Sequence, residues 1–376
     1  MLNRKVWYFG VVLLVLSAVL IPATRGETGG KPMLKEIYAD HFKIGFAARS
    51  NYWMDEPLLD HFNSVTAENI MKWESLQPRP GEFRFVHAEN LVRYAEEHGM
   101  EVVGHCLVWH NQTPDWVFLD ENGQEVSREV LLARMEEHIK TVVGRFKGRV
   151  KGWDVVNEAI EQNPATGKWE LRDTKWRRII GDDYIEYAFR FAQEADPEAE
   201  LYYNDYNAAD APKRDAIYDL VKGLLDKGLR VDGIGMQGHW DLQHPGLPAI
   251  KEALELYASL GVKVHITELD ISVYTWNNRA NLYPDGLPEA MQDRQANRYA
   301  GIFRLLKEYS DVIERVTWWG VKDSHSWKNN FPVQNRPDYP LLFDGRGNPK
   351  PSFWAIVDPS SPWRENQEKY GTAQED

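Results

Sequence analysis

The chain has 376 residues, 43% of them hydrophobic, a length that suits one large α/β domain or two ordinary ones and a composition that excludes wholesale disorder. Its formal net charge of −13 argues against nucleic acid as a partner, because such binding relies on clustered Lys and Arg that neutralise phosphates. The 15 Trp, 17 Tyr and 14 Phe exceed what a core of this size requires. We therefore expect some of these rings to face a ligand.

The N-terminal segment has the layout of a secretory signal peptide. Arg4 and Lys5 precede an apolar run from Val6 to Ile21, and Pro22 and Gly26 lie just beyond it. The run is shorter than the roughly 20 residues that a membrane-spanning helix needs. We predict that residues 1–26 are removed and that the mature protein is secreted or periplasmic, without attachment to a membrane. An uncleaved N-terminal anchor is the alternative.

Cys106 is the only cysteine, so no intrachain disulfide can form. An exported chain without disulfides depends on its core, which a domain of about 350 residues can supply. Because Cys106 lies in an apolar run, we expect a packed small hydrophobe rather than a nucleophile.

From residue 40 onward, short β-branched or aromatic runs alternate with longer stretches of helical periodicity, a pattern typical of βα units around a parallel sheet. The eight strand-like runs are Phe42 to Ala47, Asn63 to Glu68, Val102 to Trp109, Val150 to Asn157, Glu200 to Asp205, Gly233 to His239, Val262 to Leu269, and Arg315 to Lys322. The helical stretches are Ala88 to His98, Ser127 to Phe146, Asp183 to Ala195, Ala211 to Lys227, Leu247 to Leu260, and Glu289 to Tyr309.

Eight strands with helices between them predict an α/β fold, a single (β/α)8 TIM barrel whose catalytic residues follow the carboxyl ends of the strands. An open doubly wound sheet would favour a Gly-rich phosphate loop after the first strand, and residues 45–48 lack that spacing. No linker divides the chain, so we predict one catalytic domain at 34–358 and a polar C-terminal tail at 359–376. We expect this tail to fray or to wrap the barrel loosely. Extended loops, 161–176, 271–288 and 324–351, are predicted after strands four, seven and eight.

Two of the predicted strands end in a glutamate. Residues 153–159, WDVVNEA, and residues 264–270, VHITELD, each place an apolar run before a carboxylic acid. In a barrel, both acids would face one cleft, and a pair of acids in a cleft is the apparatus for breaking a glycosidic bond.

Polar and aromatic side chains gather at five further strand ends. A single Lys is usually a surface charge, a single His can be a core imidazole, and Asp270 could be a helix cap. Sugars, however, are bound by many hydrogen bonds together with apolar ring faces. The joint occurrence of Asn, Gln, Lys, His and Trp at the strand ends therefore predicts a sugar-binding cleft.

The chain resembles the endo-β-1,4-xylanases of glycoside hydrolase family 10 over residues 34–358, most specifically in the motifs WDVVNEA, GHCLVWH, ITELD and WWGVKD. The resemblance implies a retaining enzyme that cleaves internal bonds of xylan and xylo-oligosaccharides by double displacement, without cofactor or metal. It makes Glu158 the general acid/base and Glu268 the nucleophile. The substrate-binding residues that it implies are Glu68, Asn69, Lys72, His105, Trp109, Asn157, Tyr206, Gln237, His239, Trp319 and Trp327, with Tyr206 on the leaving-group side. We expect the enzyme to act as a monomer.

The predicted strands six and seven are neighbours, which places His239 beside Glu268. We predict that His239 bonds Glu268 while Asp270 fixes the imidazole from the other side. Asn157, directly before the acid, is expected to bond the sugar 2-hydroxyl, a contact that tightens in the transition state.

Three other functions remain open on the sequence. A β-glycanase acting on cellulose or mixed-linkage glucan would have to accommodate a hydroxymethyl group near Lys72 and Trp327. A metal-dependent hydrolase would need His and acid ligands gathered on a few strands, whereas the histidines are scattered and His265 has the opposite parity to Glu268. A non-catalytic sugar-binding barrel would be expected to have lost Glu158 or Glu268, and both are present.

N-terminal sequencing of the exported protein tests the signal-peptide assignment. We expect the mature chain to begin after about residue 26, because small residues and a turn follow the apolar run there. An intact Met1 would show that the segment is retained as an anchor.

Overall fold

The computed structural model describes residues 32–49 and 57–371, so the predicted signal peptide lies outside the described residues. Within them, eight parallel strands close into a barrel, because the first strand pairs with the last, Lys43 lying opposite Arg315. The predicted (β/α)8 barrel is confirmed. Its strands, in the order in which they pair, are β1 (Lys43–Ala48), β2 (Ser64–Ala67), β3 (Glu101–Val108), β4 (Gly152–Asn157), β7 (Glu200–Asp205), β8 (Gly233–Met236), β10 (Lys263–Ser272) and β11 (Ile313–Trp318).

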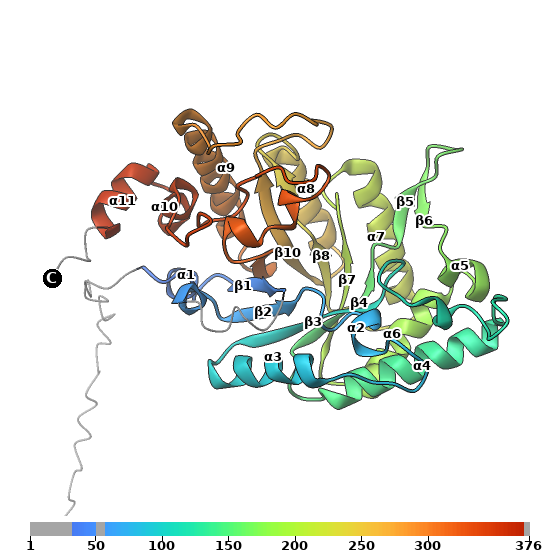
Figure 1. The fold of residues 1–376 in the computed structure, drawn as a ribbon. Helices are drawn as coiled ribbons and strands as arrows, with labels where there is room; N and C mark the ends of the chain where they lie inside the picture. The colour runs from blue at the N-terminus through green and yellow to red at the C-terminus, as the bar shows by residue number, and fades with distance from the viewer. Residues whose placement is uncertain (1–31, 50–56, 372–376) are drawn as a thin grey trace, which may run out of the picture.

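Six long helices surround the barrel (Figure 1), and all six were predicted within a few residues of their observed bounds. The Ser127 side chain caps α4 as expected, accepting a hydrogen bond from the Val130 backbone N at 3.4 Å. The apolar stripe that follows it is buried against the barrel. The six are α3 (Val86–Glu97), α4 (Arg128–Arg145), α6 (Tyr184–Ala195), α7 (Ala211–Asp226), α8 (Leu247–Ala258) and α9 (Glu289–Glu308).

Short elements decorate the barrel, and several lie in the predicted extended loops. The loop after β4 contains a two-stranded hairpin that projects from the molecule (Figure 1). These elements are α1 (Leu34–Ile37), η2 (Pro57–His61), α2 (Trp73–Leu76), η3 (Asp115–Val117), β5 (Ile160–Gln162), β6 (Trp169–Leu171), α5 (Lys175–Ile180), β9 (His239–Asp241), η4 (Asp323–His325), η5 (Trp327–Asn329), α10 (Pro351–Val357) and α11 (Trp363–Gly371).

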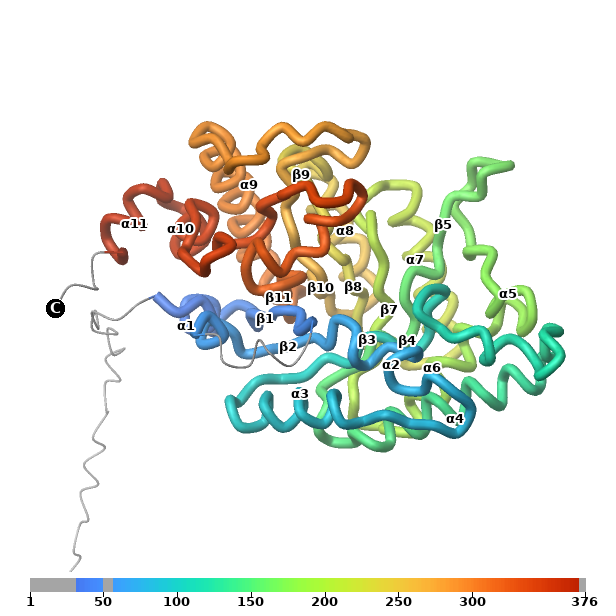
Figure 2. The backbone as a smooth tube through the Cα atoms, in the orientation of Figure 1, coloured from blue at the N-terminus to red at the C-terminus, as the bar shows by residue number. Residues whose placement is uncertain are grey.

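The predicted strands six and eight end three or four residues earlier than expected, each two residues before a glycine with positive φ. The sixth run breaks after Met236, since Gly238 has φ +83°, and the chain resumes as β9 beside the end of β10 (Figure 2). The eighth run ends at Trp318, and Gly320 follows with φ +129°. Glycine adopts such angles without the steric cost that a Cβ brings. His239 therefore lies on the separate short strand β9, and Trp319 lies on the turn after β11, rather than inside long strands.

The C-terminal tail is polar, as predicted, but it is not irregular throughout. Helix α11 forms there and lies beside α10 (Figure 1). Asn366 is buried in this contact, and its side-chain amide donates to the carbonyl oxygens of Trp354 and Asp358, each at 2.9 Å. The expectation of a loosely held tail was wrong for residues 363–371.

Close packing between β3 and β4 depends on Gly104. It pairs in register with Trp153, whose ring is fully buried and lies 6.3 Å from the ring of Phe146. A Cβ built on Gly104 would lie 2.0 Å from the Trp153 ring. Only a residue without a side chain therefore fits at this position.

The Gly104→Ala variant is expected to lose about 1 to 3 kcal/mol of unfolding free energy, because the added methyl group forces the Trp153 ring from its site. Urea denaturation measures this. Gly144→Ala is the matched control: Gly144 lies in α4 with nothing within 4 Å of an added Cβ. There the substitution should be neutral or stabilise the helix by up to about 1 kcal/mol. Equal stability of the two variants would contradict this account of the packing.

Candidate active site

The two predicted catalytic acids lie at one end of the barrel and are linked by a row of amide side chains. Gln237 Nε2 donates to Glu158 Oε1 at 3.0 Å and lies 3.3 Å from Asn157 Oδ1. Asn204 Nδ2 donates to the same Asn157 oxygen at 3.0 Å and to Glu268 Oε1 at 2.8 Å. Side chains from β4, β7, β10 and the turn after β8 therefore meet around the two acids.

Glu158 lies directly after β4 with φ +59°, in the left-handed region that non-glycine residues rarely occupy. Such a conformation costs on the order of 1–3 kcal/mol and persists only where surrounding contacts enforce it. Here the Glu158 backbone N donates to Asn204 O at 2.9 Å, and Arg172 Nε donates to Glu158 O at 2.9 Å. These contacts aim the carboxyl group, which accepts a hydrogen bond from Trp109 Nε1 at 2.9 Å.

Glu268 is buried within β10, and the expected histidine lies beside it. His239 Nε2 is 3.1 Å from Glu268 Oε2, and Asn204 Nδ2 holds the other oxygen. Burial by itself would raise the pKa of Glu268. The hydrogen bond from His239, the charges of His105 and His239, and the Asn204 amide outweigh burial and lower that pKa below its usual value. Glu268 is therefore a carboxylate at neutral pH.

His239 lies between two carboxylates, as predicted. Its Nδ1 is 2.9 Å from Asp270 Oδ2, which also accepts a hydrogen bond from Trp327 Nε1 at 2.9 Å. Burial opposes a charge on the imidazole, but Asp270 and then Glu268 raise the pKa of His239 to about 9. At neutral pH both ring nitrogens therefore carry protons and donate, one to each carboxylate.

A second hydrogen-bonded group follows β2. Asn69 Nδ2 donates to Glu68 Oε1 at 3.0 Å, while Lys72 Nζ donates to Asn69 Oδ1 at 3.0 Å and to Gln112 Oε1 at 2.7 Å. Burial raises the pKa of Glu68, with Arg49 and Lys72 opposing it. The Lys72 ammonium also lies 4.6 Å from the centre of the Trp109 ring. Trp109 therefore links this group to Glu158, to which its indole donates.

The remaining predicted residues complete the same end of the barrel. His105 Nδ1 is 2.8 Å from Asp154 Oδ2, and its ring lies edge-on to Trp319 at 5.3 Å. Trp327 lies 5.0 Å from the His239 ring. Tyr206 accepts a hydrogen bond from Arg172 Nη2 at 2.8 Å. These contacts connect the predicted site residues other than His105, directly or through one partner, to Glu158, Glu268 or the group after β2. His105 reaches Glu268 through Trp319 and then His239.

Several residues of this region were not among the predicted site residues. Asn204 belongs to the polar run at the end of β7, so the strand-end rule could have selected it. Arg172 and Lys328 lie in long loops, and nothing in their sequence neighbourhood distinguishes them from surface cations. His110 Nε2 lies 3.9 Å from Glu158 Oε2, and burial followed by the Arg172 charge lowers the pKa of His110 to about 4. It is therefore uncharged at neutral pH.

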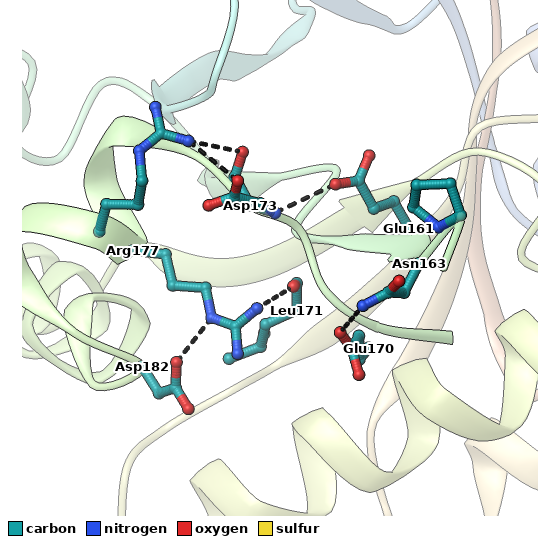
Figure 3. A pocket seen from close by; sticks show the side chains of 9 residues that line it. Glu161, Asn163, Glu170, Leu171, Asp173, Arg177 and Asp182 are labelled. Carbon is teal, nitrogen blue, oxygen red and sulfur yellow. Dashed lines mark hydrogen bonds and ion pairs between the residues drawn. The ribbon is translucent and has the colours of Figure 1, made fainter. Parts of the chain in front are cut away.

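Two hollows are lined in part by the loop after β4, which follows Glu158 in the chain. One, of about 370 Å³, is lined by His110 and Arg172, both of which contact Glu158. The other, of about 500 Å³, lies beside the β5–β6 hairpin (Figure 3). Its charged side chains are already paired, for example Arg177 Nε with Asp182 Oδ1 at 2.7 Å. The first hollow is the one that adjoins the candidate acid.

The part of the chain that the structure describes contains no group of three or more His, Cys, Asp or Glu arranged to hold a metal ion. His265 lies apart from the site and packs against Tyr202, with ring centres 4.5 Å apart. Cys106 is buried, and burial raises the pKa of its thiol. In the same described residues, no helix has both the length and the apolar content to cross a membrane.

A closed (β/α)8 barrel that presents two carboxylic acids among amide, imidazole and indole groups at its strand ends defines a glycoside hydrolase. A comparison with protein families agrees with this class. The model described as "Glycosyl hydrolase family 10" matches residues 33–359. The chain belongs to this family.

Individual relatives are similar over nearly their whole length. The endo-1,4-β-xylanase of Geobacillus stearothermophilus is 51% identical over 329 residues, which cover 87% of this chain and 98% of that protein. Endo-1,4-β-xylanase B of Paenibacillus barcinonensis is 48% identical, with the same coverage of 87% and 98%. The crystal structure of xylanase XynB from Paenibacillus barcinonensis with a conduramine derivative superimposes with a TM-score of 0.83 at 47% identity, covering 87% of this chain and 98% of that one.

The Asp270→Asn variant tests how His239 is held. Its pKa should fall from about 9, because Asp270 is the stronger of the two groups that raise it. In the wild type, protonated His239 stabilises the fold below about pH 6.5, and this contribution is lost as the pH rises through about 9. The variant should lose that pH dependence and turn over substrate more slowly.

NMR titration of the His239 ring and the pH dependence of urea denaturation measure both effects. Asp196→Asn is the control, since Asp196 is also buried but accepts its hydrogen bonds from the backbone N atoms of Gly148 and Glu198, away from Glu158 and Glu268. An unchanged His239 titration and unchanged turnover in Asp270→Asn would refute this role of Asp270.

Proposed function

We propose that the chain is a secreted, retaining endo-β-1,4-xylanase that hydrolyses internal β-1,4-xylosidic bonds of xylan and xylo-oligosaccharides. The observation that carries the proposal is the difference between the two acids. Glu268 is buried and kept ionised by His239 and Asn204, whereas Glu158 lies at the rim beside a hollow that can admit a leaving group. A retaining glycosidase needs one carboxylate nucleophile and one proton donor with these properties.

The first displacement uses both acids at once. The Glu268 carboxylate attacks the anomeric carbon while Glu158 donates its proton to the glycosidic oxygen. The bond between that carbon and oxygen breaks, and the sugar becomes an ester of Glu268. Gln237 donates to Glu158, and Asn157 lies between Gln237 and Asn204, so both amides are placed to bond sugar hydroxyls as positive charge develops on the ring.

The second displacement reverses the roles. Once Glu268 is esterified it no longer carries charge, and Glu158, now ionised, takes a proton from water. The resulting hydroxide attacks the anomeric carbon and releases the Glu268 carboxylate, so that two inversions give net retention. Arg172 and the Trp109 indole hold Glu158 throughout, which lets one side chain act first as acid and then as base.

Xylan is the proposed substrate on two grounds. The relatives reported above are named as endo-1,4-β-xylanases and share about half of their residues with this chain. In addition, Lys72 donates to Asn69 and Gln112 and lies over Trp109, so the side chain expected near the C5 substituent of the sugar is held in one position. A β-glycanase acting on cellulose or mixed-linkage glucan is the alternative. Export is proposed from the N-terminal layout alone.

Kinetics of wild type, Glu158→Ala and Glu268→Ala on xylan and on a soluble cellulose test the proposal. Wild type should prefer xylan. Glu268→Ala should abolish hydrolysis, whereas Glu158→Ala should slow it by about 10²- to 10⁴-fold on xylan. The Glu158 defect should be smaller on an aryl xylobioside whose leaving group needs no proton.

Glu97→Ala, on the exposed face of α3, is the control and should leave turnover unchanged. The anomer formed first, followed by NMR, should be β. An initial α-anomer would mean inversion and would contradict a retaining mechanism. Stronger activity on cellulose than on xylan would favour the alternative function, a β-glycanase.

A further inference from the structure

Lys328 is a buried cation for which the proposed mechanism has no role. It lies in η5, after β11, and its side chain is only 5% exposed. Removing a lysine from water is unfavourable unless an opposite charge or a strong polar contact compensates it. The groups around Lys328 therefore show what holds it in place.

The first of these groups is Asp270. His239 and Trp327 both donate to its Oδ2, so the other oxygen remains to be compensated. Oδ1 is buried and accepts no hydrogen bond from the described residues. Lys328 Nζ faces it at 3.4 Å. Lys328 thus supplies the positive charge on the free side of the carboxylate that orients His239.

The second group is aromatic. Lys328 Nζ lies 4.8 Å from the centre of the Trp327 ring and 6.0 Å from that of Trp276, distances at which an ammonium is attracted to an indole face. Phe331 stacks on Trp327 at 5.3 Å and meets Trp276 edge-on at 5.6 Å. The rings of His239, Trp327, Phe331 and Trp276, here called the aromatic row, run from the nucleophile's partner to solvent.

The outer end of the aromatic row is open. Trp276 is 54% exposed and Phe331 is 47% exposed, unusually high values for such large apolar side chains. Trp276 belongs to the loop after β10 and Phe331 to the loop after β11, so two separate segments form this end. Lys328 is the charged residue that contacts both the inner and the outer indole of the row.

We propose that Lys328 is a positioning residue for the hydrolytic reaction: it fixes Asp270, and through it the His239 contact with Glu268, while holding Trp327 and Trp276 in place for a sugar chain. This inference rests on the proposed function. It assigns two measurable effects to one side chain. Loss of the Asp270 contact slows the chemical step, and loss of the indole contacts weakens binding of substrates long enough to reach Trp276.

Other charges nearby do not replace Lys328. The carboxyl group of Asp338 is buried and accepts from Ser272 Oγ at 2.8 Å, with Arg336 Nη2 at 4.0 Å. Burial raises the pKa of Asp338 to about 6 and the Lys328 charge opposes that rise. Arg336 is directed to the Asn278 carbonyl oxygen and to the Tyr274 ring. Burial would raise the pKa of Asp270, and the charges of His239 and Lys328 oppose it, so removal of Lys328 leaves His239 as the main cationic partner of Asp270 among the described residues.

Double-mutant cycles test this role. Lys328→Met should lower kcat on a short xylo-oligosaccharide by about 10- to 100-fold, because small displacements of a reacting group are costly. The decrease should disappear in the Asp270→Asn background, since Lys328 acts through Asp270. KM should rise for long substrates more than for short ones, and this rise should disappear in the Trp276→Ala background.

Lys350→Met is the matched control. Lys350 is also a buried lysine of the last loop, paired with Asp323 at 2.9 Å and bonded to the Tyr339 and Leu341 carbonyl oxygens. Its loss should lower stability without changing kcat or the length dependence of KM. Lys328→Arg retains the charge and should recover part of kcat, which keeps the test usable if Lys328→Met does not fold.

The outcomes separate the two proposals. A wild type that does not hydrolyse xylan would defeat the proposed function. An active wild type in which Lys328 and Asp270 substitutions have independent, multiplicative effects on kcat would defeat only the inference about Lys328. The same conclusion would follow if Lys328→Met behaved like Lys350→Met.

Discussion

The site depends on one buried proton arrangement, the imidazolium of His239 held between Glu268 and Asp270. A carboxylate inside a barrel would normally take up a proton, because burial disfavours charge. Here Glu268 and Asp270 lie on opposite sides of the His239 imidazolium, so each charge lowers the free-energy cost of burying the others. Lys328 adds a second positive charge beyond Asp270. Glu268, the proposed nucleophile, therefore remains ionised in a place where it is shielded from water.

Glu158 shows the opposite solution. It lies outside the strand in a strained backbone conformation, is partly exposed, and contacts His110 and Arg172, which line a hollow. Its position is fixed by neighbours that carry no negative charge, namely Trp109, Gln237 and Arg172. The different surroundings thus suit the same residue type to the two different functions proposed for it. The hydrogen-bonded amides of Asn157 and Asn204 fix the position of the Glu268 surroundings relative to those of Glu158.

Much of the site could be predicted from the sequence, because every strand of a (β/α)8 barrel delivers the residues at its carboxyl end to the same face. Strand periodicity located Glu158 and Glu268, and adjacency of strands six and seven predicted the contacts of His239 with Glu268 and Asp270, which are confirmed. The break at Gly238 was missed because a single glycine does not reveal whether a strand continues. The helix in the C-terminal tail was missed because its sequence is polar and its stability comes from contacts with α10, such as those of Asn366.

The roles of Arg172 and Lys328 could not be predicted for a related reason. Both lie in loops whose paths are set by tertiary packing, so no periodicity connects them with the strand ends that they support. Their charges have meaning only once the partners Glu158 and Asp270 have been located in space.

The claim that Glu268 is the nucleophile is tested most directly by trapping the intermediate. In a 2-deoxy-2-fluoro xylobioside the fluorine slows both displacements, while a good leaving group keeps the first one fast. The ester therefore accumulates, and mass spectrometry of the digested protein locates it. We expect one added glycosyl group, on the peptide that contains Glu268. An unmodified protein that still hydrolyses xylan, or a sugar attached to Glu158, would contradict it.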